Sequence, residues 1–389
     1  MHIGIDGLPL TSPKTGVGHY TFQLARALAE ADPESNFELV YPSTFPPINL
    51  DTNRGEGGLP GNLKLKRAIV GPLARHWWSN GLPRYVRRNE IQLFHGTNYD
   101  VPLWRRCATV LTIHDLSPLL YPETHRRRSV RRARRRLPLM ARTADAIITP
   151  TESVRREVCE HLAVKAEKVF AIPEAARASF QPTDFAATKD VRCKLGCGDE
   201  FLLAVGTIEP RKNLSVLVTT FEQLTLARPQ GKLKLVIAGG RGWLNDSFFE
   251  TMNKSPARDR IVVTDYLHDE DLRALYASCR AFIYPSLYEG FGLPPLEAMA
   301  CGAPVVASRI PAVVEIAGAA ASFFDPTDAM DLMKNILALL EDENARNQLS
   351  LAGQTRAAEF TWQKAAQATL DVYGIAMQRF SSRDCLRII

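Results

Sequence analysis

Short apolar runs alternate along this chain with longer segments in which apolar residues recur with a helical period. Residues 281–306 give the clearest example, because an apolar run of strand length ends at Pro285, which supplies no N–H to a sheet. Gly290 and Gly292 then open a loop, and a short helical segment follows at 296–300. The pattern predicts a strand, a loop, a helix and a second strand.

The same alternation continues through most of the chain and predicts α/β structure. We expect strands at 2–5, 91–94, 109–113, 146–149, 169–173, 201–206, 235–238, 261–263, 281–284 and 305–307. Helices are expected at 20–29, 271–279, 329–341, 343–359 and 362–379. A stretch rich in Pro, Gly and Asn at 42–62 predicts a surface loop. A polar stretch at 178–199 predicts a linker, so the expected domains cover 1–178 and 198–361.

Two carboxylates, Glu289 and Glu297, bracket the glycine loop with seven residues between them. Pro294 and Pro295 suit the entry to the helix, and a helix N-terminus presents unpaired N–H groups and partial positive charge that favour phosphate. Carboxylates repel phosphate but accept hydrogen bonds from hydroxyls. A ligand that matches both the helix N-terminus and the carboxylates therefore carries phosphate and several hydroxyls, as a nucleotide diphosphate sugar does. Alternatively, Glu297 only complements the helix dipole from the first turn, and Glu289 is a solvated loop residue.

This segment resembles the donor site of the retaining glycosyltransferases of family 4, and the resemblance extends over nearly the whole chain. It implies the GT-B architecture, an α/β fold of two Rossmann-like domains facing each other across a cleft. The first domain would bind the acceptor, the second would bind the donor, and a C-terminal helix at 362–389 would pack back on the first. The resemblance implies that Glu289 contacts the donor sugar and that Glu297 holds the ribose. It also implies donor-facing backbone N–H groups at Phe291, Gly292 and Leu293.

Further donor contacts are expected in other loops of the second domain. Arg211 and Lys212 follow a predicted strand, and two cations at the carboxyl edge of a strand can neutralise a leaving diphosphate. Lys212 matches the family's lysine, whereas Thr207 stands where many members have an arginine, so Arg211 is only proposed as the other phosphate ligand. The alternative is a pair of surface cations at a helix start. The donor-binding set also includes Gly239, after another predicted strand, and Leu267, in a turn that borders the base in the family.

In the first half, Gly16 and Gly18 lie between a predicted strand and a predicted helix, where phosphate can approach a helix N-terminus. An ordinary βα turn explains them equally well, but the resemblance places them near the pyrophosphate and the acceptor. His95 and His114 each follow a predicted strand, at the edge of a sheet that lines ligand crevices. We expect His95 to be a structural histidine bonded to loop backbone. For His114 the resemblance implies contact with the transferred sugar.

Charge is distributed unevenly, with 26 Lys and Arg against 17 Asp and Glu in residues 1–180 and 22 against 25 in the rest. Eight arginines between Arg126 and Arg136 supply much of this excess, and apolar residues recur among them at helical spacing. They predict a basic amphipathic helix, interrupted or kinked at Pro138, that suits an anionic membrane surface. The alternative is a solvated charged face. The residues expected to contact membrane or acceptor are Arg127, Arg131 and Arg135.

The hydrophobic content of 46% suffices for two cores, and no apolar run approaches bilayer-spanning length. Because the N-terminus also lacks a signal pattern, we predict a cytoplasmic protein, with peripheral attachment to the inner membrane face as a hypothesis. The seven scattered cysteines predict reduced thiols. Residues 269–271 fit the Asp-x-Asp pattern of metal-dependent sugar transferases, but we interpret them as the cap and first turn of a helix. Neither a metal nor another cofactor is therefore expected.

These observations predict a hexosyltransferase that uses a nucleotide diphosphate sugar and retains the anomeric configuration. The stretch at 117–123, SPLLYPE, is similar to bacterial mannosyltransferases of polysaccharide, O-antigen and lipopolysaccharide assembly, which favours GDP-mannose as donor and a lipid-linked saccharide as acceptor. A GT-B nucleotide-sugar 2-epimerase or a phosphorylase is the alternative; the first needs no acceptor, and the second needs phosphate or a pyridoxal cofactor. A nucleic-acid partner is not expected, because the arginine run lacks interleaved aromatics.

Overall fold

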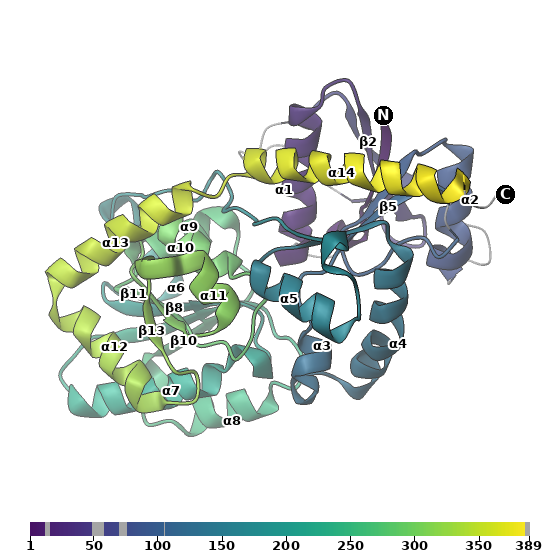
Figure 1. Ribbon diagram of the computed structural model, residues 1–389. Helices are drawn as coiled ribbons and strands as arrows, with labels where there is room; N and C mark the ends of the chain where they lie inside the picture. The colour runs from purple at the N-terminus through teal and green to yellow at the C-terminus, as the bar shows by residue number, and fades with distance from the viewer. Residues whose placement is uncertain (12–15, 49–57, 70–75, 105, 386–389) are drawn as a thin grey trace. The chain divides into compact units, whose positions relative to one another are not determined.

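The computed structural model describes residues 1–11, 16–48, 58–69, 76–104 and 106–385. Part of the expected loop at 42–62, and residues 386–389 of the expected C-terminal helix, therefore lie outside the described residues. The chain divides into two compact units (Figure 1). The first unit contains Met1–Leu116, Arg131–Glu174 and Thr361–Ile389, and the second contains Ser117–Val130 and Ala175–Phe360.

Within the described residues, the first unit holds a seven-stranded parallel sheet in the order β3-β2-β1-β4-β5-β6-β7. Its strands are β1 (His2–Asp6), β2 (Asn36–Pro42), β3 (Leu63–Ala68), β4 (Leu93–Gly96), β5 (Ala108–Thr112), β6 (Ala146–Thr149) and β7 (Val169–Ala171). Most strand positions are buried, as expected where helices cover both faces of a parallel sheet. The longer helical segments are α1 (Gly16–Ala31), η3 (Trp77–Gly81), α2 (Leu82–Arg88), α4 (Arg127–Thr143), α5 (Glu152–His161) and α14 (Trp362–Cys385). The first residues of α4, up to Val130, belong to the second unit.

The second unit holds, within its described residues, a six-stranded parallel sheet in the order β10-β9-β8-β11-β12-β13. Its strands are β8 (Phe201–Val205), β9 (Lys234–Ala238), β10 (Ile261–Thr264), β11 (Ala281–Tyr284), β12 (Val305–Ser308) and β13 (Ser322–Phe324). The longer helices are α6 (Lys189–Leu195), α7 (Leu214–Ala227), α8 (Asp246–Lys254), α9 (Asp269–Ser278), α10 (Leu293–Ala300), α11 (Pro311–Ala317), α12 (Ala329–Glu341) and α13 (Glu343–Ala358). Short helical turns include α3 (Ser117–Leu120), η4 (Pro122–Thr124) and η7 (Pro210–Lys212).

The strand order of the second sheet reverses between β8 and β11. From β8 the chain adds β9 and β10 on one side, and it then returns to place β11, β12 and β13 on the other. The loops that follow β8 and β11 therefore leave the same sheet edge in opposite directions and open a crevice, the usual ligand position in such sheets. The two loops also meet directly, because the Leu287 N–H donates to the Arg211 carbonyl oxygen at 2.9 Å.

His95 is a structural residue of the first unit. It lies inside β4 rather than after a strand, because β4 runs two residues further than expected. Its Nδ1 lies 2.8 Å from the Tyr373 hydroxyl of α14, and its Nε2 lies 2.8 Å from the Thr112 hydroxyl. Burial and the nearby His114 lower the pKa of His95 to about 3, so the ring is neutral. The expected hydrogen bond to loop backbone is wrong, because both partners are side-chain hydroxyls, and these hold the ring within the first unit.

Several element boundaries differ from the expected ones. The helix α1 already begins at Gly16, so Gly16 and Gly18 lie in its first turn and not in a turn before it. The arginine-rich helix α4 continues through Pro138 without interruption. The stretch at 178–199, expected as a linker, contains α6 and belongs to the second unit. In Figure 1, α14 crosses α1, and the Tyr373 contact with His95 anchors it within the first unit.

Candidate functional site

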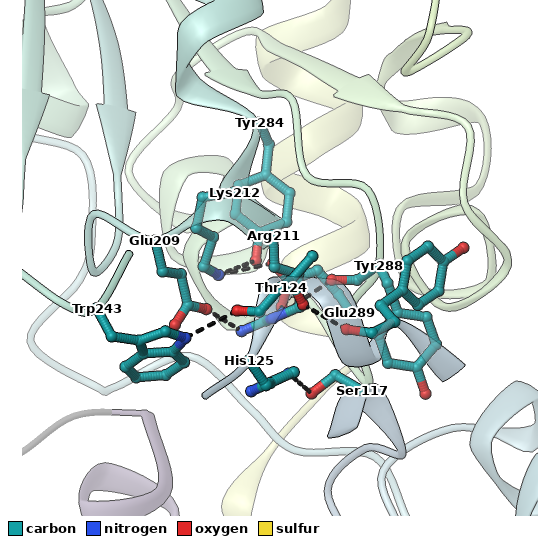
Figure 2. A network of polar contacts seen from close by, with 11 residues as sticks. Ser117, Thr124, His125, Glu209, Arg211, Lys212, Trp243, Tyr284, Tyr288 and Glu289 are labelled. Carbon is teal, nitrogen blue, oxygen red and sulfur yellow. Dashed lines mark hydrogen bonds and ion pairs between the residues drawn. The ribbon is translucent and has the colours of Figure 1, made fainter. Parts of the chain in front are cut away.

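The loops after β8 and β11 bring Arg211, Lys212 and Glu289 together. Lys212 Nζ lies 2.6 Å from one Glu289 carboxylate oxygen, and Arg211 Nη1 lies 2.7 Å from the other (Figure 2). Glu289 is only 9% exposed, so the alternative that it is a solvated loop residue is wrong. The side chains of both cations are mostly buried as well, so Arg211 and Lys212 are not ordinary surface cations.

Three further groups hold these cations in place. Arg211 Nη2 donates to the Glu209 carboxylate at 2.6 Å, and Arg211 Nη1 also donates to the Tyr288 carbonyl oxygen at 2.8 Å. Lys212 Nζ donates to the Tyr284 hydroxyl at 3.2 Å. Glu209 is buried, and sequence reasoning did not select it. Its position two residues before Arg211 is a signal that could have suggested the contact.

The electrostatics of the cluster depend on the two cations. Burial raises the pKa of Glu289, but Arg211 and Lys212 outweigh this effect and hold the pKa at about 2. For Glu209 the balance is reversed, because burial outweighs the attraction of Arg211 and Lys212 and raises the pKa. Glu289 is thus an ionised hydrogen-bond acceptor at neutral pH. The cluster holds two cations that can move from a carboxylate to an arriving phosphate without first losing a full hydration shell.

Glu297 belongs to a separate polar cluster of the second unit. The helix α10 begins at Leu293, so Glu297 lies in its second turn and not, as expected, in its first. Its carboxylate is 3% exposed and accepts a hydrogen bond from Arg177 Nε at 2.8 Å. Arg177 Nη1 contacts Asp269 at 2.5 Å. Burial lowers the pKa of Arg177, but Glu297 and Asp269 outweigh it and raise the pKa above its ordinary value.

The acidic residues 269–271 form the first turn of α9, as expected, but they do not cap it. The cap residue is His268, and its side chain makes no capping hydrogen bond. Asp269 pairs with Arg177, and Asp271 lies 3.0 Å from Lys194 Nζ. The two aspartates of the Asp-x-Asp pattern thus have different cationic partners. Across the residues that the structure describes, no group of three or more His, Cys, Asp or Glu side chains is placed to hold a metal ion.

Glycines let the backbone of the donor loops approach closely. Gly292 has a φ of +112° at the start of α10, a conformation that favours glycine. A Cβ atom at Gly239 would lie 2.1 Å from the Gly206 carbonyl oxygen, and Gly239 also lines a cavity of about 290 Å³ at the carboxyl ends of β9 and β10. Four more predicted donor residues lie in the same unit, with Phe291 and Leu293 buried, Leu267 packed against the core and Thr207 half-buried. The predicted donor residues Gly16 and Gly18 instead lie in the first unit, in α1.

Residues 117–130 cluster with the second unit and contact its loops. The Trp243 indole N–H donates to the Thr124 carbonyl oxygen at 2.8 Å, and the ring of His125 packs against Trp243 with centroids 5.7 Å apart (Figure 2). Tyr121 packs against Tyr288, the residue before Glu289, with centroids 5.1 Å apart. Sequence reasoning did not select these aromatic residues, since their pairing joins segments more than 100 positions apart.

His114 lies in the first unit, directly after β5 as expected. Its Nε2 lies 2.8 Å from the Thr97 carbonyl oxygen, and its Nδ1 lies 3.3 Å from the Glu174 carboxylate. Both partners only accept hydrogen bonds, so this arrangement requires an imidazolium with a proton on each nitrogen. Burial lowers the pKa of His114, but the hydrogen bond and charge of Glu174 outweigh it and raise the pKa.

Five of the arginines of α4 differ in their surroundings. Arg132 and Arg136 form ion pairs with Asp100 of the first unit. The three that we selected for membrane or acceptor contact, at intervals of four residues, are exposed: Arg127, Arg131 and Arg135. Among the described residues, no helix combines the length and the apolar character needed to cross a bilayer.

Comparison with known proteins identifies both halves of the chain. The Glycosyltransferase Family 4 pattern matches residues 14–177, and the Glycosyl transferases group 1 pattern matches residues 192–356. O-antigen chain mannosyltransferase B of Escherichia coli is 29% identical over 378 residues, which cover 94% of this chain and 97% of that protein. Serotype-specific mannosyltransferase WbdA of Escherichia coli is 28% identical over 417 residues; the match covers 99% of this chain but only 49% of WbdA.

A solved structure supports the fold. Sucrose-phosphate synthase from Thermosynechococcus elongatus superposes with a TM-score of 0.76 over 98% of this chain and 99% of that chain. At 22% sequence identity this likeness concerns the fold alone. The predicted architecture of two Rossmann-like α/β domains of the GT-B type is confirmed.

We predict that Glu174→Gln lowers the pKa of His114, because the substitution removes the charge that raises it and leaves the burial that lowers it. The stability that this ionisation contributes is complete below the ordinary histidine pKa of 6.5 and is lost as the pH rises through the raised value. The variant should therefore lose more stability at pH 6 than at pH 9. NMR titration of the His114 ring measures the pKa, with Glu167→Gln as a control at a surface carboxylate. An unchanged titration would show that Glu174 does not hold the proton.

Proposed function

Because the chain belongs to glycosyltransferase family 4 and is a hexosyltransferase, we propose that it transfers mannose from GDP-mannose to a lipid-linked saccharide and retains the anomeric configuration. The observation that carries the diphosphate part of this proposal is the buried pair of cations, Arg211 and Lys212, on Glu289. The named mannosyltransferases among the relatives support mannose as the sugar.

The cations are suited to stabilise the leaving group. When the bond between the sugar C1 and the phosphate oxygen breaks, negative charge develops on the GDP, and fixed cations at that point lower the barrier. Arg211 and Lys212 come from the loop after β8, at the edge where the crevice of such a sheet lies. The N-terminus of α10, with the N–H groups of Phe291, Gly292 and Leu293, supplies further positive potential for the diphosphate.

Glu289 would change partners when the donor binds. In the structure it accepts hydrogen bonds from both cations. With the donor in place, a sugar hydroxyl would donate to the ionised carboxylate, and the cations would turn toward the diphosphate. Glu297, fixed by Arg177, would accept from the ribose hydroxyls, and His114 would contact the transferred sugar.

The transfer step needs no nucleophile from the protein. The acceptor oxygen would form its bond to C1 on the face from which the GDP leaves, and the acceptor's proton would pass to the departing phosphate oxygen. This arrangement accounts for the retained configuration, since attack and departure use one face. It also gives the two cations their role, because they hold the oxygen that receives the proton.

The sugar end of the site lies beside residues 117–130. Tyr121, within the stretch that is similar to bacterial mannosyltransferases, packs on Tyr288, and Tyr288 precedes Glu289 in the chain. We assign this segment to recognition of the sugar. The nucleoside would bind in the cavity that Gly239 lines. Thr207 and Leu267 lie within two positions of other residues that line this cavity.

We further propose that the reaction proceeds without a metal ion and that the protein attaches peripherally to the inner membrane face. The cations Arg211 and Lys212 would take the place that a divalent ion has in metal-dependent transferases.

The exposed arginines of α4 would hold the protein on anionic lipids, at about 1 kcal/mol per basic residue near the surface.

We expect Lys212→Met to lower kcat by a factor of about 10² to 10³, because it removes a charge that acts most strongly on the leaving group. The assay follows mannose transfer from GDP-mannose to a synthetic lipid-linked mannoside in EDTA, with NMR of the product, which should carry the donor's α configuration. Lys254→Met, at an exposed position on α8, is the control. Inversion of the product, or equal kcat in both variants, would contradict the mechanism.

For the membrane contact, we expect the triple substitution of Arg127, Arg131 and Arg135 by Gln to weaken sedimentation with vesicles that contain phosphatidylglycerol. Three charges at about 1 kcal/mol each correspond to a loss of roughly 100-fold in partitioning. Transfer to a water-soluble mannoside should be unaffected. Unchanged vesicle binding would show that these arginines form only a solvated face.

A further inference from the structure

A wide basic groove lies at the amino ends of the strands of the second sheet, the end opposite Glu289. Four of its residues immediately precede or begin a strand: Glu200 before β8, Lys234 at the start of β9, Arg260 before β10 and Arg280 before β11. Because the strands are parallel, these residues gather at one edge. The donor loops leave the other edge, so the groove is distinct from the site described above.

Cations dominate this groove. It has a volume of about 1060 Å³, and its lining includes Lys232, Lys234, Arg260, Arg280 and Arg346. A smaller cavity of about 150 Å³ shares Arg260, Arg280 and Arg346 with it. The acidic residues of the lining are Asp199 and Glu200, and Asp199 is already paired with a further cation, Arg192. The groove therefore carries an excess of positive charge.

Most of these cations are held by carbonyl oxygens, which fix their positions without neutralising them. Arg260 Nη2 donates to the Pro229 carbonyl oxygen at 2.7 Å, and Arg346 Nη1 donates to that of Leu339 at 2.7 Å. Lys234 Nζ donates to the Gly196 carbonyl oxygen at 2.6 Å. Arg280 instead pairs with Glu200 at 2.7 Å.

The fixed positions distinguish this groove from a solvated basic surface. The side chains of freely solvated cations spread apart, whereas Lys234, Arg260, Arg280 and Arg346 are half-buried and come from four different segments around one opening. The contacts of Arg260 and Arg346 use one terminal nitrogen of each guanidinium. A guanidinium has five N–H donors in a planar fork that matches phosphate oxygens, so both retain donors for a ligand.

We propose that this groove binds a phosphorylated anion with at least two phosphate groups. Several separated cations match several phosphates better than one, and the groove has room for more than one. The ligand is a soluble polyphosphorylated molecule or the headgroup of an anionic lipid, which present the same chemistry. The site does not depend on the transferase function proposed above, because it uses none of the donor-site residues.

The test is a calorimetric titration with inorganic pyrophosphate of the wild-type chain and of the double variant Lys232→Gln/Arg260→Gln. Pyrophosphate that binds at the donor site gives the same signal in both proteins, so the difference between the two titrations measures binding in the groove. We expect the variant to lose one equivalent of pyrophosphate or to bind it at least tenfold more weakly, as expected for the loss of charge-assisted hydrogen bonds. The matched control, Lys254→Gln/Lys334→Gln, removes two exposed charges of the same unit and should bind like the wild type.

Lys232→Glu alone reverses one exposed charge and should weaken binding in the same direction, which keeps the test decisive if the double variant folds poorly. Vesicles with and without cardiolipin, a lipid whose headgroup carries two phosphate groups, distinguish the two sources. A lipid headgroup ligand predicts that the double variant binds cardiolipin vesicles more weakly than the wild type, although the α4 arginines remain, and that pyrophosphate competes with these vesicles. A soluble ligand predicts that vesicle binding does not change. Equal pyrophosphate binding by the wild type, the double variant and Lys232→Glu would overturn the proposal.

Discussion

One buried carboxylate, Glu289, accepts hydrogen bonds from two cations, and the arrangement of the donor loops depends on this contact. Two cations side by side repel each other, and burial makes each costly unless it is paired. Glu289 supplies the pairing, and its low pKa reflects the attraction that it receives in return. The strand order makes the contact possible, because only neighbouring strands at the point of reversal send their loops into one crevice.

The same cluster relates the fold to its chemistry. Under the proposed function, the site needs fixed positive charge to hold a departing diphosphate, and it must also remain folded before a donor binds. Carboxylates that neutralise the cations until then would meet both requirements. Glu289 would afterwards use its oxygens for sugar hydroxyls. Glu209 and the Tyr288 carbonyl oxygen both accept hydrogen bonds from Arg211 and orient its guanidinium.

Much of the fold follows from the sequence, because buried parallel strands are continuous apolar runs. The runs at 201–206, 281–284 and 305–307 predicted β8, β11 and β12 to within one residue. Boundaries set by local backbone preference were less accurate. Proline and glycine residues predicted a start of α10 near residue 296, but the helix begins three residues earlier, and Glu297 consequently lies in the second turn.

The candidate site could be predicted as a set of residues but not as a set of contacts. Arg211 and Lys212 are separated from Glu289 by 78 and 77 positions, and only the sheet topology brings them together. Arg211 and Lys212 lie in a short turn, η7, that is followed by Asn213 with a φ of +53°, and the apolar pattern of the sequence did not indicate this turn. Arg177 pairs with Glu297, and Glu174 pairs with His114. Both residues follow β7, in a segment without the apolar periodicity that predicts strands and helices, so the sequence did not indicate their contacts.

The central claim is that Arg211 and Lys212 bind the diphosphate of the donor in the absence of a metal ion. Calorimetric titration of GDP in EDTA, with the wild-type chain and with Arg211→Gln and Lys212→Gln, tests it most directly. The account predicts binding by the wild type and a loss of about tenfold or more in affinity for each variant, as expected when a charge-assisted contact is removed. Binding that requires Mg²⁺ or Mn²⁺, or that neither substitution weakens, would contradict it.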